Sequence, residues 1–196
     1  MIEAVAVTNT LRLFVAVNPS PASVSLFGET IDRLRPTAPQ AKWVHSERLH
    51  VTLAFLGDTE ETKLVSVTAA VKAVAAEHAP FALRFEGGGL FWIRRQPQIL
   101  WAGIGGDVPA LCRVRDDLTK RLESIGYAPE HRAYSPHLTL ARAANPGGDE
   151  ALLSCAKLIE GQSFGETTIR EVVLYKSEPS SRGPMYTALL CEPFRV

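Results

Sequence analysis

The chain has 196 residues, of which 46% are hydrophobic and 21% charged, proportions that suit one globular domain or two small lobes. Lys and Arg together number 21, as do Asp and Glu, so the formal net charge is zero. This balance argues against a broad surface for coating nucleic acid, which needs clustered cations, but not against a protein that grips only one end of a nucleic acid. No apolar run is long enough to span a bilayer, and the N-terminal residues lack the features of a signal peptide.

The three cysteines are odd in number and lie apart in apolar segments, at Cys112, Cys155 and Cys191. This pattern is typical of buried, reduced thiols. With no signal peptide expected, it predicts a cytoplasmic protein.

The first half of the chain alternates predicted strands and helices. In chain order we expect a strand at 12–17, a helix from 21 to about 35, a strand at 50–56, a helix from 59 to about 78 and a strand at 81–86. β-branched and aromatic runs indicate the strands, and apolar residues three or four positions apart indicate the helices. Ser20 before Pro21 is a typical helix start. The glycines at 87–89 are expected to end the last strand and form a flexible connector.

The second half repeats this order. We expect a strand at 98–104, a helix from 107 to 125, a strand at 137–142, a helix from 149 to 158, and strands at 168–175 and 185–190. A shift of 87 residues places the elements of the first half on those of the second, although the two sequences differ. The shift predicts a repeated architecture; the alternative is the ordinary alternation of an α/β chain.

We therefore predict an α+β fold with two pseudo-symmetric lobes. Each lobe is a mainly antiparallel sheet with helices on the outside, and an active-site cleft lies between the lobes. The expected organisation is a single domain over 1–196 with interleaved lobes and a pseudo-repeat of roughly 12–86 and 98–176.

Two related tetrapeptides occupy equivalent strands of this repeat. They are His50-Val-Thr-Leu53 and His137-Leu-Thr-Leu140, and their histidines are 87 residues apart (137 − 50). Side chains alternate along a strand, so each histidine shares a face with the threonine two residues later. In the first strand this rule puts His50, Thr52 and Ala54 toward the cleft, and Val51, Leu53 and Phe55 in the core.

A histidine pair in one cleft suits acid–base cleavage of a phosphodiester. Free imidazole titrates near pH 6.5, so one ring can accept a proton while the other donates one. The hydroxyls of Thr52 and Thr139 can donate to phosphate oxygens, and the constellation needs no metal. Strict alternation puts Arg142 on the opposite face from His137, but it lies at the strand end, where the backbone can turn it toward a phosphate. A solvent-exposed arginine is the alternative.

The segments His50-Val-Thr-Leu-Ala-Phe-Leu-Gly57 and Pro136-His-Leu-Thr-Leu-Ala-Arg142 resemble the paired motifs of the two-histidine (2H) phosphoesterase superfamily. Other segments resemble its LigT/ThpR-type branch, the RNA 2′,3′-cyclic phosphodiesterases. They are Arg12-Leu-Phe-Val-Ala-Val17, Trp43, Arg132-Ala-Tyr-Ser-Pro-His137 and Leu174-Tyr-Lys-Ser177 with Gly183 and Tyr186. The resemblance covers nearly the whole chain in the right order. Tyr134 departs from the pattern, because phenylalanine is more usual there.

The resemblance implies metal-independent hydrolysis of a terminal 2′,3′-cyclic phosphate on RNA to a 2′-phosphomonoester. It implies that His50 is the general acid and His137 the general base, with Thr52, Thr139 and Arg142 on phosphate-contacting positions. The expected partner is an RNA 3′ end or oligonucleotide with a 2′,3′-cyclic phosphate. No cofactor, metal, membrane or obligate protein partner is expected, and the chain is expected to be a monomer. Some relatives also join 2′–5′ RNA ends.

Two alternatives to this function stay open. One is a non-catalytic module that binds nucleotides or RNA ends, although such a binder has no chemical need for two proton-transfer groups. The other is a phosphodiesterase for a small cyclic nucleotide or ADP-ribose cyclic phosphate.

Several further side chains are candidates for lesser roles. His45 and His131 are read as loop histidines, because their spacings to the motif histidines fit no zinc motif. Tyr134 is a possible contact for a terminal base. Phe91 and Trp101 are expected in the core. Three cations either line the cleft or lie on the solvated surface: Arg132, Lys176 and Arg182.

Overall fold

The computed structural model describes residues 9–128, 133–181 and 183–195. The strands of this part are β1 (Thr10–Val17), β2 (Lys42–Trp43), β3 (Val51–Glu60), β4 (Phe81–Ile93), β5 (Gln96–Gly106), β6 (Leu138–Arg142), β7 (Ser163–Ile169), β8 (Glu171–Glu178) and β9 (Met185–Pro193). The helices are α1 (Pro21–Leu34), α2 (Leu64–Glu77), α3 (Val108–Ser124) and α4 (Ala151–Leu158), with short 3-10 turns at Ser46–Arg48 and Glu61–Lys63. Helices and strands alternate along the chain, as the sequence predicts.

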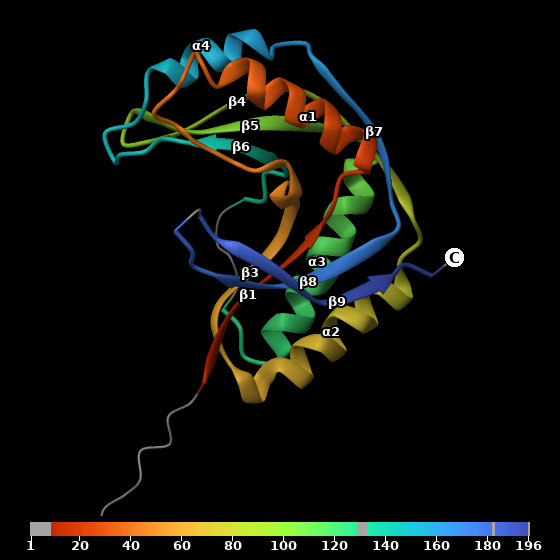
Figure 1. Cartoon of the computed structure of the whole chain (residues 1–196). Helices are drawn as coiled ribbons and strands as arrows, with labels where there is room; N and C mark the ends of the chain where they lie inside the picture. The colour runs from red at the N-terminus through yellow and green to blue at the C-terminus, as the bar shows by residue number, and fades with distance from the viewer. Residues whose placement is uncertain (1–8, 129–132, 182, 196) are drawn as a thin grey trace, which may run out of the picture.

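The strands form a curled antiparallel sheet whose order is symmetric about its centre. The order is β7-β4-β5-β6-β3-β1-β8-β9, and β2 adds to β6. Reading outward from the junction of β6 and β3, β5 matches β1 and β4 matches β8. Figure 1 shows the two halves of the sheet curving around a common inner face. The strands that follow the two motif histidines therefore lie at the middle of the sheet.

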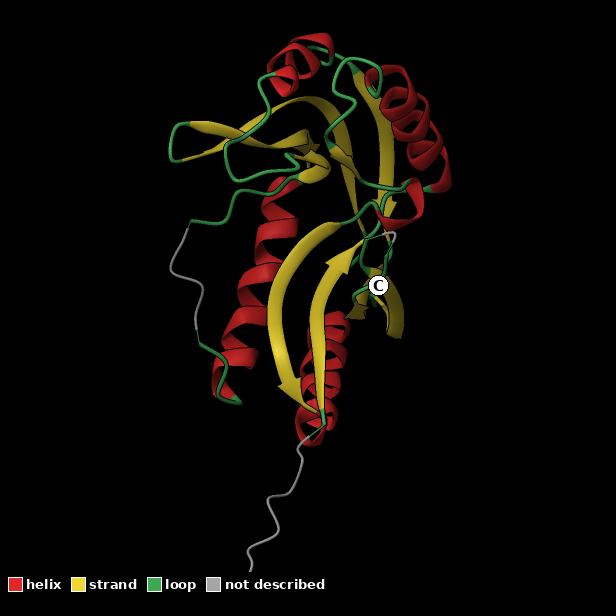
Figure 2. Cartoon of the chain, turned by 60° about the vertical axis from the view of Figure 1, so that its left-hand side comes forward, coloured by secondary structure: helices red, strands yellow, loops and turns green. Residues whose placement is uncertain are grey.

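The four α-helices lie on the outer side of the curled sheet (Figures 1 and 2). Helices α1 and α4 pack on the half that contains β4, β5 and β7, and α2 and α3 pack on the other half. Helix α1 follows β1 yet covers the opposite half, where the Ser20 backbone N–H donates to Thr167 Oγ1 of β7 at 2.9 Å. The chain therefore crosses from one half of the sheet to the other between β1 and α1.

Helix starts follow the sequence signals at two positions. The side chain of Ser20 accepts from the Ser23 N–H at 3.2 Å, and Pro21 occupies the first turn of α1. Asp107 caps α3 by accepting from the Ala110 N–H at 2.9 Å. Both caps satisfy backbone donors that the helix itself leaves unpaired.

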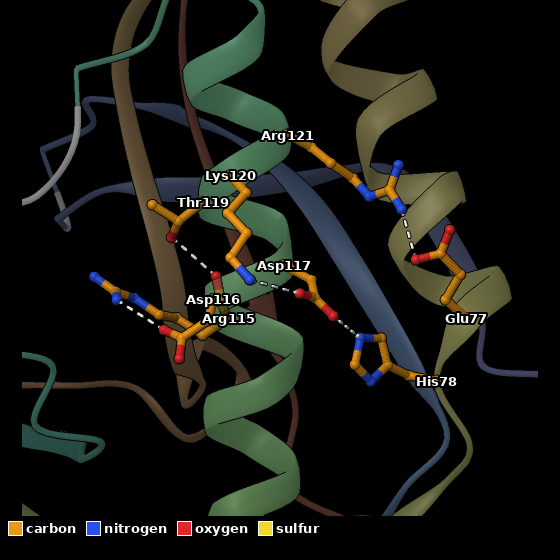
Figure 3. A network of polar contacts seen from close by, with 8 residues as sticks. All are labelled: Glu77, His78, Arg115, Asp116, Asp117, Thr119, Lys120 and Arg121. Atoms are coloured by element: carbon orange, nitrogen blue, oxygen red, sulfur yellow. Dashed lines mark hydrogen bonds and ion pairs between the residues drawn. The ribbon is translucent and has the colours of Figure 1, made fainter.

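Polar contacts join α2 and α3 on the outer side of the molecule, as Figure 3 shows. Nε2 of His78 lies 2.9 Å from Asp117 Oδ2, and Arg121 Nη2 donates to Glu77 Oε2 at 2.6 Å. Lys120 approaches the same Asp117 carboxylate at 3.5 Å. These contacts join the two helices that pack on β3, β8 and β9.

Three predictions of local structure are wrong. Strand β3 continues through Gly57 to Glu60, so α2 starts at Leu64. The segment at 168–175 is split between β7 and β8. The glycines at 87–89 lie inside β4 and form no connector, because Gly88 and Gly89 pair with Ala102 and Trp101 of β5. A Cβ on Gly88 would lie 2.3 Å from the Trp101 carbonyl oxygen, so this close strand contact requires glycine.

The core fills the space between the outer face of the sheet and the helices. It contains the apolar residues of the two motif strands, including Val51, Leu53, Leu138 and Leu140, none of which is more than 3% exposed. The prediction that Cys155 is buried is confirmed, but Cys112 is half-buried and Cys191 is exposed. Cys191 belongs to β9, which lies at one edge of the sheet.

Candidate active site

The two motif strands meet directly after their histidines. Val51, the first residue of β3, pairs with Leu138, the first residue of β6. Both are fully buried. His50 and His137 immediately precede the paired residues, and each is half-buried. The symmetric centre of the sheet therefore brings together two histidines that are 87 residues apart in sequence (137 − 50).

Both imidazoles are held in the same way. Nδ1 of His50 lies 2.7 Å from the Arg48 carbonyl oxygen, and Nδ1 of His137 lies 2.8 Å from the Ser135 carbonyl oxygen. A carbonyl can only accept, so each Nδ1 carries the proton and donates it to the residue two positions earlier. In the neutral ring, Nε2 is then left as the acceptor. Within the part of the chain that the structure describes, no group bonds to either Nε2.

The environment favours the neutral form of both rings. Burial lowers the pKa of His50, and the charges of Arg142 and His137 lower it further, against the opposing effect of the Arg48 carbonyl. Burial also lowers the pKa of His137, the Ser135 carbonyl opposes this, and the charge of Arg142 adds to the lowering. His137 thus acts on His50, and Arg142 acts on both, so the three groups form one electrostatic cluster.

A β-bulge brings Arg142 to the same face as Thr139. Thr139 pairs with Trp101, whereas Ala141 pairs with Leu100, so Leu140 is an extra residue in β6. The bulge resets the alternation, because an extra residue reverses which face the following side chains occupy. Arg142 is exposed at the end of β6. The bulge, and not a turn of the backbone at the strand end, therefore sets the direction of Arg142.

An equivalent bulge lies in β3 and overturns one prediction. Thr52 pairs with Ala16 and Ala54 with Val15, so Leu53 is the extra residue. Ala54 therefore packs against the core cluster, whereas Phe55 is 73% exposed on the face that Phe14 also occupies. The expectation that Ala54 faces the site and Phe55 the core is wrong, because strict alternation fails at a bulge.

Aromatic rings contact both histidines. The ring centroids of Phe14 and Tyr186 lie 4.9 and 5.4 Å from that of His50. Phe91 packs edge-on against His137 at 4.7 Å. The expectation that Phe91 and Trp101 are core residues is wrong: both are half-buried, and they contact each other at 5.3 Å. The run of glycines in β4 gives the Trp101 ring this space, since a Cβ on Gly89 would lie 2.7 Å from it.

Tyr134 links the segment before the second motif to the first motif strand. Its hydroxyl donates to the Thr52 carbonyl oxygen at 2.9 Å, and the Arg115 guanidinium lies 5.1 Å from the centre of its ring. Burial raises the pKa of Tyr134, so the phenol stays protonated and can donate. These contacts favour a role in positioning Thr52, while contact with a base stays a prediction.

The two threonine hydroxyls have no hydrogen-bond partner among the residues that the structure describes. Thr52 and Thr139 are half-buried on the inner face of the sheet. No described group bonds to either hydroxyl, since the contact at Thr52 involves its carbonyl. Both hydroxyls are therefore available to a ligand.

Sequence reasoning missed two cations near the site. The Arg48 side chain lies against Gly183, and its charge acts on Tyr186. Lys42 of the two-residue strand β2 pairs with Arg142. Neither belongs to a motif; Lys42 lies 95 positions (137 − 42) before His137, so only the fold reveals its place.

Of the three candidate cations, the structure describes Lys176. Lys176 forms an ion pair with Glu178 at 2.8 Å and lines a surface hollow of about 460 Å³ at the outer ends of β1, β3 and β8. Arg132, Arg182 and His131 lie outside the described residues. Within the described ranges, no three His, Cys, Asp or Glu side chains are grouped so that they could hold a metal ion. In the same ranges, no helix is long and apolar enough to cross a membrane.

The chain is an α+β protein with a curled antiparallel sheet and a pair of histidines at the centre of that sheet. Comparison with known proteins gives its family. The family model described as "2'-5' RNA ligase superfamily" matches residues 21–180. The chain belongs to this superfamily, which confirms the resemblance to LigT-type two-histidine phosphoesterases.

Curated relatives share one description. The chain is 35% identical over 158 residues to an "RNA 2',3'-cyclic phosphodiesterase" of Geobacillus stearothermophilus, a match that covers 79% of this chain and 48% of the relative. The chain thus spans about half the length of that relative. A protein of Methanothermobacter thermautotrophicus with the same description is 30% identical over 186 residues, covering 95% of this chain and 99% of the relative.

Solved structures share the fold. The crystal structure of the protein TT0787 of Thermus thermophilus gives a TM-score of 0.80 at 27% identity, covering 94% of this chain and 98% of that one. The structure of E. coli LigT complexed with 3′-AMP gives a TM-score of 0.73 at 23% identity, covering 95% and 99%.

Proposed function

We propose that this chain hydrolyses the terminal 2′,3′-cyclic phosphate of RNA and leaves a 2′-phosphomonoester. Relatives described as RNA 2′,3′-cyclic phosphodiesterases support the reaction class. The observation that carries the proposal is the matched anchoring of the two imidazoles, which leaves both Nε2 atoms facing no described partner. Two such nitrogens supply the base and the acid that phosphodiester hydrolysis requires.

In the proposed mechanism His137 is the general base and His50 the general acid. Nε2 of His137 takes a proton from water while the water oxygen attacks phosphorus. The bond from phosphorus to the 3′ oxygen breaks, and protonated Nε2 of His50 gives its proton to that oxygen. The bound phosphate anion raises the pKa of His50 in the complex, because a nearby negative charge favours the imidazolium. The 2′ oxygen keeps the phosphate, and proton exchange with solvent restores both rings.

The remaining site residues are proposed to hold the phosphate. The hydroxyls of Thr52 and Thr139 donate to its non-bridging oxygens, and the Arg142 guanidinium balances the charge that develops during attack. Arg142 suits this role because its charge already reaches both histidines. No step requires a metal, and we propose that one chain, acting as a monomer with a single catalytic domain, is sufficient.

The direct experiment identifies the product. Purified protein is incubated with a short RNA that ends in a 2′,3′-cyclic phosphate, and the product is resolved from authentic 2′-phosphate and 3′-phosphate standards. We expect only the 2′-phosphate. Formation of the 3′-phosphate would contradict the assignment of the leaving oxygen, and an unchanged substrate that nonetheless binds would indicate a non-catalytic binding module.

Parallel reactions test the alternatives. Activity is expected to survive EDTA; loss to EDTA with recovery on adding zinc would contradict the metal-free mechanism. Mononucleoside 2′,3′-cyclic phosphates and ADP-ribose cyclic phosphate serve as competing substrates, and a higher kcat/KM for either would replace RNA as the proposed substrate. A 2′-5′ joining activity is tested by supplying an RNA with a free 5′-hydroxyl end.

A further inference from the structure

The turn that joins β4 to β5 is made of two arginines in a backbone conformation that is unusual for arginine. Ile93 pairs with Gln96, so Arg94 and Arg95 are the two central residues of the turn, and their φ angles are 51° and 66°. Two-residue hairpin turns with positive φ at both positions strongly favour Asn-Gly or Gly-Gly. Strained backbone of this kind is found mainly at functional positions, so the choice of arginine needs an explanation beyond the turn itself.

Both arginines present their charge to solvent. Arg94 and Arg95 are exposed, and among the residues that the structure describes no carboxylate forms an ion pair with either guanidinium. The two residues before them are also exposed and are apolar, since Trp92 is 53% and Ile93 54% accessible. The tip of the hairpin is therefore an exposed surface with two uncompensated cations.

The face of the sheet that carries the histidines reaches this hairpin. Ile99 of β5 pairs with Arg142 of β6 on one side and with Phe91 of β4 on the other. Residues opposite each other in a ladder share a face, so Arg142, Ile99 and Phe91 form one row across the inner face. Phe91 also contacts His137, with ring centroids 4.7 Å apart. The hairpin thus begins beside the proposed general base.

The same face continues outward along β4. Ile93 lies two residues after Phe91 and occupies the histidine face, whereas Trp92 between them points to the other side. A strand advances about 3.3 Å per residue, which puts Arg94 about 10 Å along β4 from Phe91. Figure 1 shows β4 and β5 extending to the left-hand end of the upper half of the molecule. A ligand that leaves the histidines in this direction therefore meets both arginines.

The chemistry of the tip suits a chain of phosphates. Guanidinium groups bind phosphate oxygens through paired N–H donors, and positively charged surfaces follow the backbone of single-stranded nucleic acids. An RNA whose terminal cyclic phosphate lies between the histidines carries such a backbone on its 5′ side. At about 3.4 Å of rise per stacked nucleotide, the distance of about 10 Å corresponds to about three nucleotides.

We propose that Arg94 and Arg95 bind backbone phosphates of the RNA on the 5′ side of its terminal nucleotide. This inference rests on the proposed function and adds a second RNA contact to it. The contact holds the RNA chain and takes no part in the chemistry, so it sets how strongly a long RNA is preferred to a mononucleotide. It is compatible with a formal net charge of zero, because two local cations grip one RNA end without a basic surface overall.

The test compares a long and a short ligand that both end in the unreactive product group. The long ligand is a labelled ten-nucleotide oligoadenylate with a terminal 2′-phosphate, and the short one is 2′-AMP, which has no upstream phosphate. Kd is measured for wild type, for Arg94→Gln/Arg95→Gln and for the control Arg113→Gln/Arg170→Gln. Arg113 of α3 and Arg170 between β7 and β8 are exposed, so the control removes the same charge outside the hairpin.

Wild type is expected to bind the long RNA more tightly than 2′-AMP. Arg94→Gln/Arg95→Gln should raise the Kd of the long RNA about 2- to 30-fold, the range for losing two exposed ion pairs, and leave the Kd of 2′-AMP unchanged. The slope of log Kd against log salt concentration should fall by about 1.4, because each phosphate contact with a single strand contributes about 0.7. The control should match wild type in both quantities.

A second variant guards against misfolding of the hairpin. Arg94→Asn/Arg95→Gly introduces the residues that this turn prefers, so its midpoint of urea unfolding should rise while its affinity for the long RNA falls as in the glutamine variant. An unchanged Kd and salt slope for the long RNA in both variants would overturn the proposal. An equal loss of affinity for 2′-AMP would also overturn it, because the hairpin would then act on the histidine site instead of the upstream chain.

Turnover of the same RNA with a terminal cyclic phosphate separates the two claims. If wild type hydrolyses this RNA while the hairpin variants bind the long RNA as wild type does, the hairpin inference is wrong and the proposed function stands. If the hairpin variants lose affinity for the long RNA but wild type shows no turnover, the RNA contact stands and the hydrolytic function is wrong.

Discussion

Val51 pairs with Leu138, so the strand that follows His50 meets the strand that follows His137 at their first residues. The pairing lies at the centre of a sheet whose strand order is symmetric about it. Each histidine therefore has the same neighbours in its own half: a carbonyl two residues before and a threonine two residues after. The proposed acid–base pair is a consequence of this symmetry.

The first prediction concerns the pH dependence of catalysis. Burial and neighbouring charge lower the pKa of both His50 and His137 in the free enzyme. The profile of kcat/KM, which reports free-enzyme groups, should be bell-shaped with its maximum below pH 6.5. The profile of kcat should lie at higher pH, because bound phosphate raises the pKa of the acid. Initial rates from pH 4.5 to 9 measure both; a flat profile would count against two titrating histidines.

The second prediction concerns Arg142. Its charge lowers the pKa of both histidines, so Arg142→Gln should move the kcat/KM profile to higher pH as well as reducing its maximum by about 100-fold. Arg142→Lys should keep the profile in place but still lose activity, because lysine lacks the bidentate geometry. Arg35→Gln, at an exposed arginine after α1, is the control. An unshifted profile in Arg142→Gln would refute the electrostatic coupling.

The third prediction separates two roles for Tyr134. Tyr134→Phe keeps the ring but removes the hydrogen bond to the Thr52 carbonyl. If Tyr134 positions Thr52, kcat should fall severalfold, KM should hold, and the free energy of unfolding should fall by about 1 kcal/mol. If Tyr134 instead contacts a base through its ring, kcat and KM should both equal those of wild type. Steady-state kinetics and urea denaturation distinguish these results.

The fourth prediction tests the glycine run of β4. A Cβ on Gly88 would lie 2.3 Å from the Trp101 carbonyl oxygen and 2.5 Å from Ile159 Cδ1. Gly88→Ala should therefore reduce the free energy of unfolding by about 1–3 kcal/mol, as overpacking does. Gly147 has nothing within 4 Å of its Cβ position, so Gly147→Ala should change stability by less than about 0.5 kcal/mol. Equal stabilities of the two variants in urea would contradict the close contact.

Much of the candidate site could be predicted from the sequence because its residues lie in two short motifs. The two His-x-Thr motifs occupy equivalent places in the two halves of the chain, and they identify both histidines and both threonines. The apolar residues that alternate with them identify the core face of each strand. Strand alternation failed at Ala54, Phe55 and Arg142, because a bulge depends on how two strands pair and leaves no mark in the sequence of one strand.

Long-range contacts account for the other differences. Gly88 and Gly89 suggested a loop by composition, yet they lie inside β4 and pair with β5. Glycine is required at both positions because a Cβ would collide with Trp101 of the neighbouring strand. Phe91 suggested the core by its hydrophobicity, but the curled sheet places it against His137. Lys42 approaches Arg142 only through the pairing of β2 with β6. None of these contacts follows from local sequence pattern.

The central claim is that His50 and His137 act together as acid and base, and it is tested by single-turnover rates of His50→Ala and His137→Ala on RNA ending in a 2′,3′-cyclic phosphate. Each variant should lose at least about 100-fold in rate, since a positioned acid or base contributes roughly that much or more. Substrate binding and the free energy of unfolding, measured beside the rates, should stay close to wild type. A rate within threefold of wild type in either variant would contradict the acid–base pair.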